Sequence, residues 1–100
     1  NIGRFAALGL EVHITEMDIK CVNKGSKQPC TPELLAAQGE LYGGVVRACL
    51  KHPLCKSIET WGFTDKVTWI GSNTAPLPFN TTYGKKPAFD AIVDAFLNGL

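Results

Sequence analysis

Two short strand-like runs, separated by one long helical segment, limit what this chain can fold into. Residues 10–15 alternate and are rich in β-branched side chains, and residues 56–61 form a second run of this kind. Strands joined through a helix pair in parallel, and a parallel sheet is covered on both faces. Two strands are too few for such a sheet to stand alone. The sequence therefore predicts part of a larger α/β protein, most simply a barrel.

Turn and capping residues set the predicted boundaries of the helices. Residues 1–8 are expected to end a helix at Gly9. Thr31-Pro32 is a favourable start for the long helix, which His52-Pro53 ends near residue 50. Residues 62–86 are predicted as a long functional loop before a last helix that opens at Pro87. The expected apolar faces are Leu34, Leu35, Leu41, Tyr42, Val45, Val46 and Cys49 in the long helix, and Phe89, Ile92, Val93, Phe96 and Leu97 in the last one.

Composition excludes several classes of protein. The chain has 100 residues, of which 45% are hydrophobic and 19% charged, as in a globular domain. Its net charge is +1 with scattered Lys and Arg, so we expect neither nucleic-acid nor membrane binding. No apolar run is long enough to span a bilayer. Because the chain begins at Asn1 rather than Met, we expect it to be a piece of a longer protein.

Four cysteines allow three disulfide pairings, and spacing alone does not choose among them. Local pairing is the simplest hypothesis, with Cys21 joined to Cys30 and Cys49 joined to Cys55. Each bridge would close a short loop. Four free thiols in a cytosolic protein are the alternative. A zinc site fits less well, because no CxxC pair is present.

The carboxylates of Glu16 and Asp18 follow the first strand, where catalytic groups of parallel sheets usually lie. Strict alternation places Glu16 on the face of Val12 and Ile14. If that apolar face points into a barrel, Glu16 lies in its mouth and can act as a nucleophile or an acid/base. A bulge near the strand end could re-aim it. A structural, ion-paired glutamate is the alternative, and Asp18 could instead be a solvated turn residue.

Two tryptophans follow the second strand. Sugars present flat C–H faces that pack on aromatic rings, so Trp61 and Trp69 beside a carboxylate favour a carbohydrate cleft over simple core packing. Glu59 is expected to share a face with Trp61. It is a rival second catalytic carboxylate, although an interior ion pair explains it more simply.

Three further polar features have structural interpretations. We expect His13 to lie between helix and sheet, and Asp65 to pair locally with Lys66. Asn80-Thr81-Thr82 fits an N-glycosylation acceptor.

Four linked motifs resemble one enzyme family. They are Ile-Thr-Glu-Met-Asp-Ile (14–19), Ala-Cys-Leu-Lys-His-Pro-Leu-Cys (48–55), Glu-Thr-Trp-Gly-Phe-Thr-Asp-Lys-Val-Thr-Trp (59–69) and Lys-Lys-Pro-Ala-Phe (85–89). Their order and spacing resemble the last quarter of the family-10 glycoside hydrolases, the endo-β-1,4-xylanases. The resemblance implies an α/β fold, the C-terminal portion (strands 7 and 8 with their helices) of a (β/α)8 TIM barrel. Residues 1–100 would then be a partial catalytic barrel domain, incomplete at the N-terminus.

The resemblance also implies roles for individual residues. Glu16 matches the nucleophile, and Asp18 matches the acidic residue that supports a strand-six histidine in contact with it. Trp61 and Trp69 match aromatic residues that line the cleft. Cys49 and Cys55 match a family disulfide, which implies a secreted, extracellular protein.

The implied reaction is retaining hydrolysis of xylan or xylo-oligosaccharides, without a metal or organic cofactor, by a full-length monomer. The acid/base glutamate of the family precedes Asn1, so the 100 residues alone are expected to be inactive. One alternative is a secreted carbohydrate-binding or structural module without catalysis. Another is the same barrel acting on a different β-linked glycan, or in an exo mode.

Overall fold

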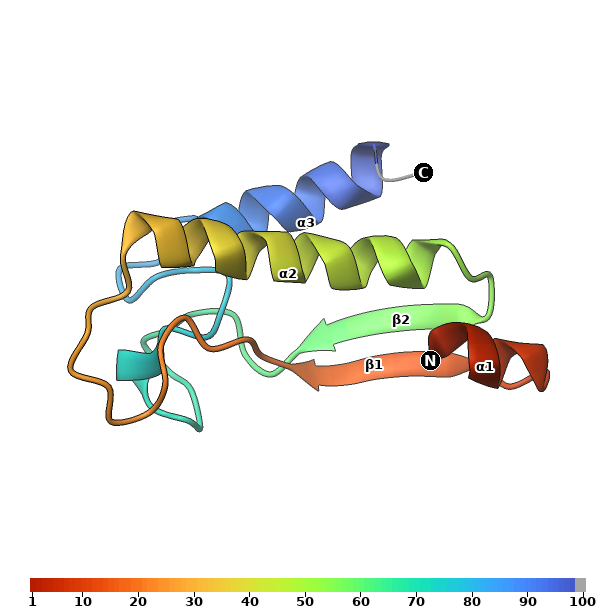
Figure 1. Cartoon of the computed structure of the whole chain (residues 1–100), viewed down its shortest axis with the longest axis horizontal. Helices are drawn as coiled ribbons and strands as arrows, with labels where there is room; N and C mark the ends of the chain where they lie inside the picture. Colours follow the sequence, from red (N-terminus) through yellow and green to blue (C-terminus); the bar gives the residue numbers. More distant parts are fainter. Residues whose placement is uncertain (99–100) are drawn as a thin grey trace.

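The computed structural model describes residues 1–98 and confirms the predicted order of helix, strand, helix, strand and helix (Figure 1). The elements are α1 (Ile2–Ala7), β1 (Val12–Met17), α2 (Pro32–Leu50), β2 (Cys55–Thr60), the short 3-10 helix η1 (Ser72–Thr74) and α3 (Pro87–Asn98).

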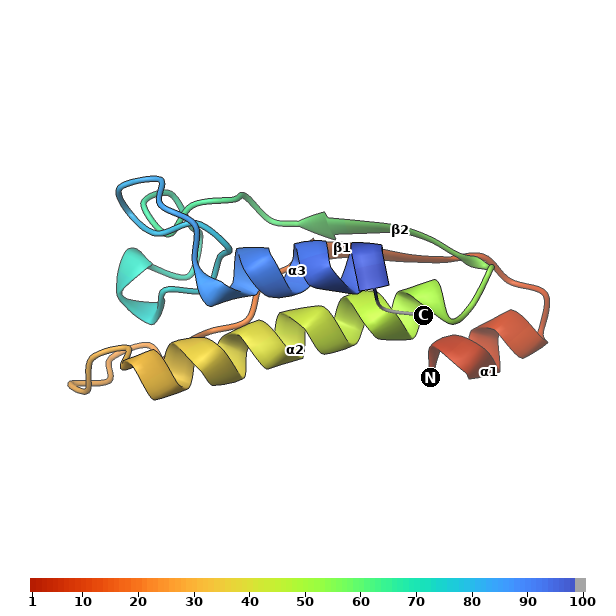
Figure 2. The same ribbon diagram turned by 90° about the horizontal axis from the view of Figure 1, so that it is seen from above.

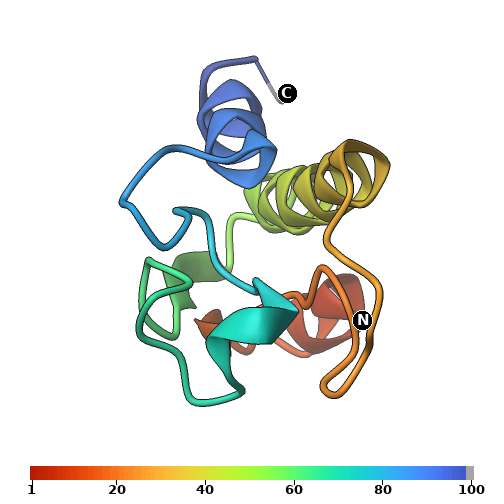
Figure 3. The ribbon, with the colours of Figure 1, turned by 90° about the vertical axis from the view of Figure 1, so that its left-hand side faces the viewer.

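β1 and β2 pair in parallel and form a two-stranded sheet. Both strands end at the same edge, so the β1–α2 loop (residues 18–31) and the β2–α3 loop (residues 61–86) leave the sheet side by side (Figure 1). α2 and α3 both cover one face of the sheet (Figures 2 and 3). The two loops therefore meet at the carboxyl edge, where ligands of parallel α/β proteins bind.

α2 starts where its capping residues predict. The Thr31 hydroxyl accepts a hydrogen bond from the Leu34 N–H at 3.2 Å, and Pro32 occupies the first helical position. Its buried stripe differs from the predicted one, since Leu41 is 58% exposed. The buried residues are Gln38, Gly39, Tyr42, Gly43, Val46 and Cys49.

Small residues explain this difference, because α2 and α3 meet through close backbone contacts. A Cβ on Gly39 would lie 3.1 Å from the Pro87 carbonyl carbon, and one on Gly43 would lie 3.3 Å from the Ala91 Cβ. On α3 the buried residues are likewise Ala88 and Ala95. Phe89, Ile92 and Phe96 of the predicted apolar face line a pocket with residues of both strands. Val93, Phe96 and Leu97 are exposed on this chain.

The structure contains two disulfides, Cys21–Cys30 and Cys49–Cys55. These are the local pairs that the sequence favoured. The first joins the two ends of the β1–α2 loop, and the second joins the end of α2 to the start of β2. None of the helices described in residues 1–98 is both long and apolar enough to cross a bilayer.

Candidate active site at the carboxyl edge of the sheet

A β-bulge ends β1. Ile14 pairs with Ile58, and Met17 pairs with Thr60, so β1 advances three residues while β2 advances two. The extra residue lies between Ile14 and Met17, where Glu16 has a φ of +58°. A non-glycine residue in this left-handed region is uncommon and costs free energy, and such residues gather at functional sites.

The bulge decides which way Glu16 points. Met17, Ile58 and Thr60 line an apolar pocket with residues of α2 and α3, so their side chains face the helices. Ile14 shares this face because it pairs with Ile58. Thr15 and Glu16 are consecutive exposed residues between two that face the helices. Both therefore lie on the open side of the sheet.

This arrangement corrects two predictions. The apolar face of β1 packs toward the helices and does not line a barrel interior, and strict alternation fails at Glu16 because of the bulge. The predicted position of His13 between helix and sheet is also wrong. It is exposed on the face opposite the helices, with its Nδ1 2.8 Å from the Ser57 hydroxyl and its Nε2 3.4 Å from a Glu11 carboxylate oxygen.

Asp18 and the two tryptophans are brought together at the same edge. The Trp69 indole N–H donates to the Asp18 Oδ2 at 2.8 Å, across the two loops. The Trp61 and Trp69 ring centroids are 6.2 Å apart, with planes tilted by 40°. The Trp61 backbone N–H donates to the Met17 carbonyl at 3.1 Å, directly after Glu16. Both indoles stay open, with exposed fractions of 48% and 66%.

Glu59 is exposed and forms no ion pair with any side chain in residues 1–98, so the expected interior ion pair is absent from the described chain. The described residues also contain no group of three or more His, Cys, Asp or Glu side chains arranged to hold a metal ion. The chemistry that this edge offers is a carboxylate beside an open aromatic surface.

The predicted pairing of Asp65 with Lys66 is wrong. Asp65 is buried and its Oδ2 accepts a hydrogen bond from Lys86 Nζ at 2.8 Å. The Asp65 Oδ1 accepts the Leu77 backbone N–H at 2.7 Å. Burial lowers the pKa of Lys86, while the Asp65 carboxylate opposes that shift.

Gln38 and Tyr42 are buried polar residues of α2 that the sequence interpretation did not single out as functional. The Tyr42 hydroxyl donates to the Pro76 carbonyl, and burial raises the pKa of this phenol well above its ordinary value. Their four-residue spacing along the apolar stripe, continued by Val46, is the signal that could have found Gln38.

Comparisons with known proteins show which family the chain belongs to. The sequence model of the family described as glycosyl hydrolase family 10 matches residues 1–95. Endo-1,4-beta-xylanase A of Phanerodontia chrysosporium is 38% identical over 98 residues, which cover 94% of this chain and 23% of that protein.

Solved structures of xylanases share the fold. Native xylanase 10B of Thermotoga maritima superposes with a TM-score of 0.82 at 35% identity, over 96% of this chain and 30% of that one. Xylanase 10B of Thermotoga petrophila, in complex with xylobiose, superposes with a TM-score of 0.82 at 35% identity, over 96% of this chain and 29% of that one. The chain thus spans less than a third of each relative, and its fold is the predicted C-terminal portion of a (β/α)8 barrel. The chain belongs to glycosyl hydrolase family 10.

Proposed function

We propose that the protein containing this chain is a retaining endo-β-1,4-xylanase whose substrate is xylan or xylo-oligosaccharides. Its matched relatives are named endo-1,4-beta-xylanases, and a related structure holds xylobiose. The observation that carries the proposal is the bulge of β1, which turns the Glu16 carboxylate away from the helices at the edge where Trp61 and Trp69 are exposed.

Glu16 is the proposed nucleophile. Its carboxylate would attack the anomeric carbon of the sugar and form a covalent glycosyl ester, while a second carboxylic acid gives its proton to the departing glycosidic oxygen. That second group, now a carboxylate, would take a proton from water. The water oxygen would then displace Glu16 and release the sugar with its original anomeric configuration.

The second carboxyl group must lie about 5–5.5 Å from Glu16 in a retaining enzyme. We assign it to a part of the barrel other than residues 1–98, so these residues would form part of a catalytic barrel domain. Because one carboxylate cannot supply both steps, we expect the isolated 100-residue chain to be inactive.

Trp61 and Trp69 are the proposed sugar-binding surface, since exposed indole rings offer apolar area to the C–H faces of a xylose unit. Asp18 keeps its proposed role in supporting Glu16 through a strand-six histidine. Its hydrogen bond to Trp69 adds a direct effect on the orientation of that ring.

We also propose that the protein is secreted and acts as a monomer, without a metal or organic cofactor. Two disulfides in a short stretch of chain support an oxidising compartment.

The test is Glu16→Gln in the full-length protein. We expect turnover of xylan to fall by at least about a thousandfold while folding and xylan binding persist, because only the attacking group is lost. Glu11→Gln removes a carboxylate near the other end of the same strand and is the matched control. Unchanged turnover in Glu16→Gln would exclude Glu16 as the nucleophile. A wild-type protein that binds xylan without cleaving it would favour a binding module instead.

A further inference from the structure

A buried segment of irregular structure in the β2–α3 loop is held by its carbonyl groups. We name residues 74–77 the carbonyl segment; Thr74 and Leu77 are fully buried, and Ala75 has a φ of +46°. A buried backbone carbonyl without a partner costs free energy, so each must be satisfied. The structure supplies partners from three directions, namely the β1–α2 loop, α2 and Lys86 at the end of the β2–α3 loop.

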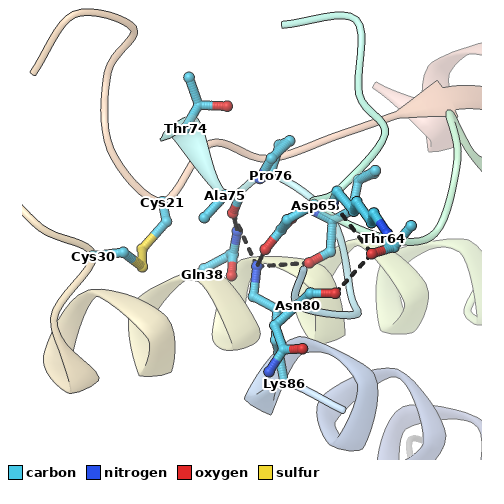
Figure 4. Close-up of polar contacts among 12 residues, drawn as sticks. Cys21, Cys30, Gln38, Thr64, Asp65, Thr74, Ala75, Pro76, Asn80 and Lys86 are labelled. Carbon is cyan, nitrogen blue, oxygen red and sulfur yellow. Dashed lines mark hydrogen bonds and ion pairs between the residues drawn. A yellow bond between two sulfur atoms is a disulfide. The ribbon is translucent and has the colours of Figure 1, made fainter. Parts of the chain in front are cut away.

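Gln38 of α2 contacts both loops with one amide group. Figure 4 shows this side chain beside Ala75 of the β2–α3 loop. It is 2% exposed, and its Nε2 donates to the Ile19 carbonyl at 2.7 Å and to the Ala75 carbonyl at 2.6 Å. The two hydrogens of this nitrogen are thereby both used, one for each loop.

Backbone hydrogen bonds also join the two loops directly. The Ile19 N–H donates to the Pro76 carbonyl at 3.2 Å, and the Cys21 N–H donates to the Thr74 carbonyl at 2.8 Å. On the other side, Lys86 Nζ donates to the Ala75 carbonyl at 3.0 Å and to the Leu77 carbonyl at 2.7 Å. Gln38 therefore ties both loops to α2 through one amide, and the Tyr42 hydroxyl of the same helix donates to the Pro76 carbonyl beside it.

The amide orientation of Gln38 follows from these partners. With nitrogen and oxygen exchanged, Oε1 would face two carbonyl oxygens, which is repulsive. Oε1 itself has no hydrogen-bond partner within residues 1–98. Gln38 therefore acts in this cluster as a donor of two hydrogen bonds, one to each loop. Neither glutamate nor methionine can donate to both loops.

We propose that Gln38 is a positioning residue that sets Trp69 relative to Glu16. Ile19 directly follows Asp18, whose carboxylate holds the Trp69 indole, and Ala75 lies six residues beyond Trp69 on the same loop. Fixing both carbonyls to α2 fixes the two loops relative to each other. The inference rests on the proposed xylanase function for its kinetic consequence.

The kinetic test uses the full-length protein with Gln38→Met, which keeps the shape, and Gln38→Glu, which keeps the size but replaces the donor by an acceptor. Gln28, exposed in the β1–α2 loop, gives the matched controls Gln28→Met and Gln28→Glu. At a temperature where circular dichroism shows every variant folded, we expect kcat/KM on xylo-oligosaccharides to fall about tenfold to a hundredfold for both Gln38 variants. We expect no change for the controls.

A double-mutant cycle separates positioning from general destabilisation. If Gln38 acts through Trp69, most of the loss caused by Gln38→Met disappears when Trp69→Ala is already present, because the ring to be positioned is gone. An equal loss in both backgrounds would overturn the proposal.

Amide hydrogen exchange provides a readout that does not require catalysis. In Gln38→Met the backbone amides of Ile19, Cys21 and Leu77, which donate within this cluster, should exchange faster than in the wild type and in Gln28→Met. Unchanged exchange would overturn the proposal whatever the kinetics. A wild type without xylanase activity would instead refute the proposed function, and exchange would still decide whether Gln38 ties the loops.

Discussion

The two loops at the carboxyl edge of the sheet are held in different ways. Buried polar groups hold the β2–α3 loop, because Lys86 donates hydrogen bonds to Asp65 and to two carbonyls of the carbonyl segment. In the β1–α2 loop, residues 23–29 are all exposed, and the Cys21–Cys30 disulfide closes the ends. The first loop is built like a protein interior without regular structure, whereas residues 23–29 of the second form an exposed segment closed by a covalent bond.

This difference teaches where each loop is vulnerable. A buried charge pair is costly to break because the remaining charge has no water to replace its partner. A disulfide mainly restricts the unfolded chain, so its loss lowers stability without moving the folded loop. Mutations in the β2–α3 loop should therefore disturb both stability and the site, and loss of the disulfide should disturb stability alone.

The largest effect is expected for Lys86→Met. It leaves the Asp65 carboxylate buried without its cation, and we expect the free energy of unfolding to fall by about 3–5 kcal/mol. Denaturant-induced unfolding of the full-length protein measures this loss. Lys85→Met is the matched control, because Lys85 is exposed and lies 4.9 Å over the Phe89 ring, a contact worth about 1 kcal/mol or less. Equal losses in the two variants would contradict the buried pair.

A smaller effect is expected when Cys21 and Cys30 are both replaced by Ser. The bridge spans nine positions, for which chain entropy predicts a loss of about 2–3 kcal/mol in unfolding free energy. We expect kcat/KM to stay near the wild-type value, because the carbonyl segment and Gln38 still hold Ile19. A large loss of activity in the folded double variant would show that the disulfide also positions the site.

The smallest effect is expected at Asp18, where two variants separate its proposed roles. Asp18→Ala removes the acceptor for the Trp69 indole and should raise KM for xylo-oligosaccharides by roughly fivefold, equivalent to about 1 kcal/mol. Asp18→Asn keeps an acceptor oxygen and should retain most of the affinity. If both variants lose equally, the charge of Asp18 matters and the indole contact does not.

Local patterns were sufficient for the order of the elements. The Thr31-Pro32 start and the His52-Pro53 end of α2 depend on neighbouring residues only, and both predictions agree with the structure. The family motifs identified the barrel portion for the same reason, since they lie within short stretches of chain.

Features that depend on residues far apart in the chain were not predicted from the sequence. Asp65 pairs with Lys86 rather than its neighbour Lys66, because the chain folds back over the intervening loop. The bulge at Glu16 sets two residues of β1 between Ile14 and Met17 against one residue of β2, which periodicity within a single strand does not reveal. The buried stripe of α2 follows the glycines that admit α3, so Leu41 is exposed although it is apolar.

The central claim is that the bulge presents Glu16 as the attacking group. The most direct measurement is mass spectrometry of the full-length protein after reaction with a slow, 2-fluoro-substituted xylobioside that accumulates the covalent intermediate. We predict one glycosyl ester, located on Glu16. A label on Glu59 or on any other residue, or hydrolysis with inverted configuration and no label, would contradict the account.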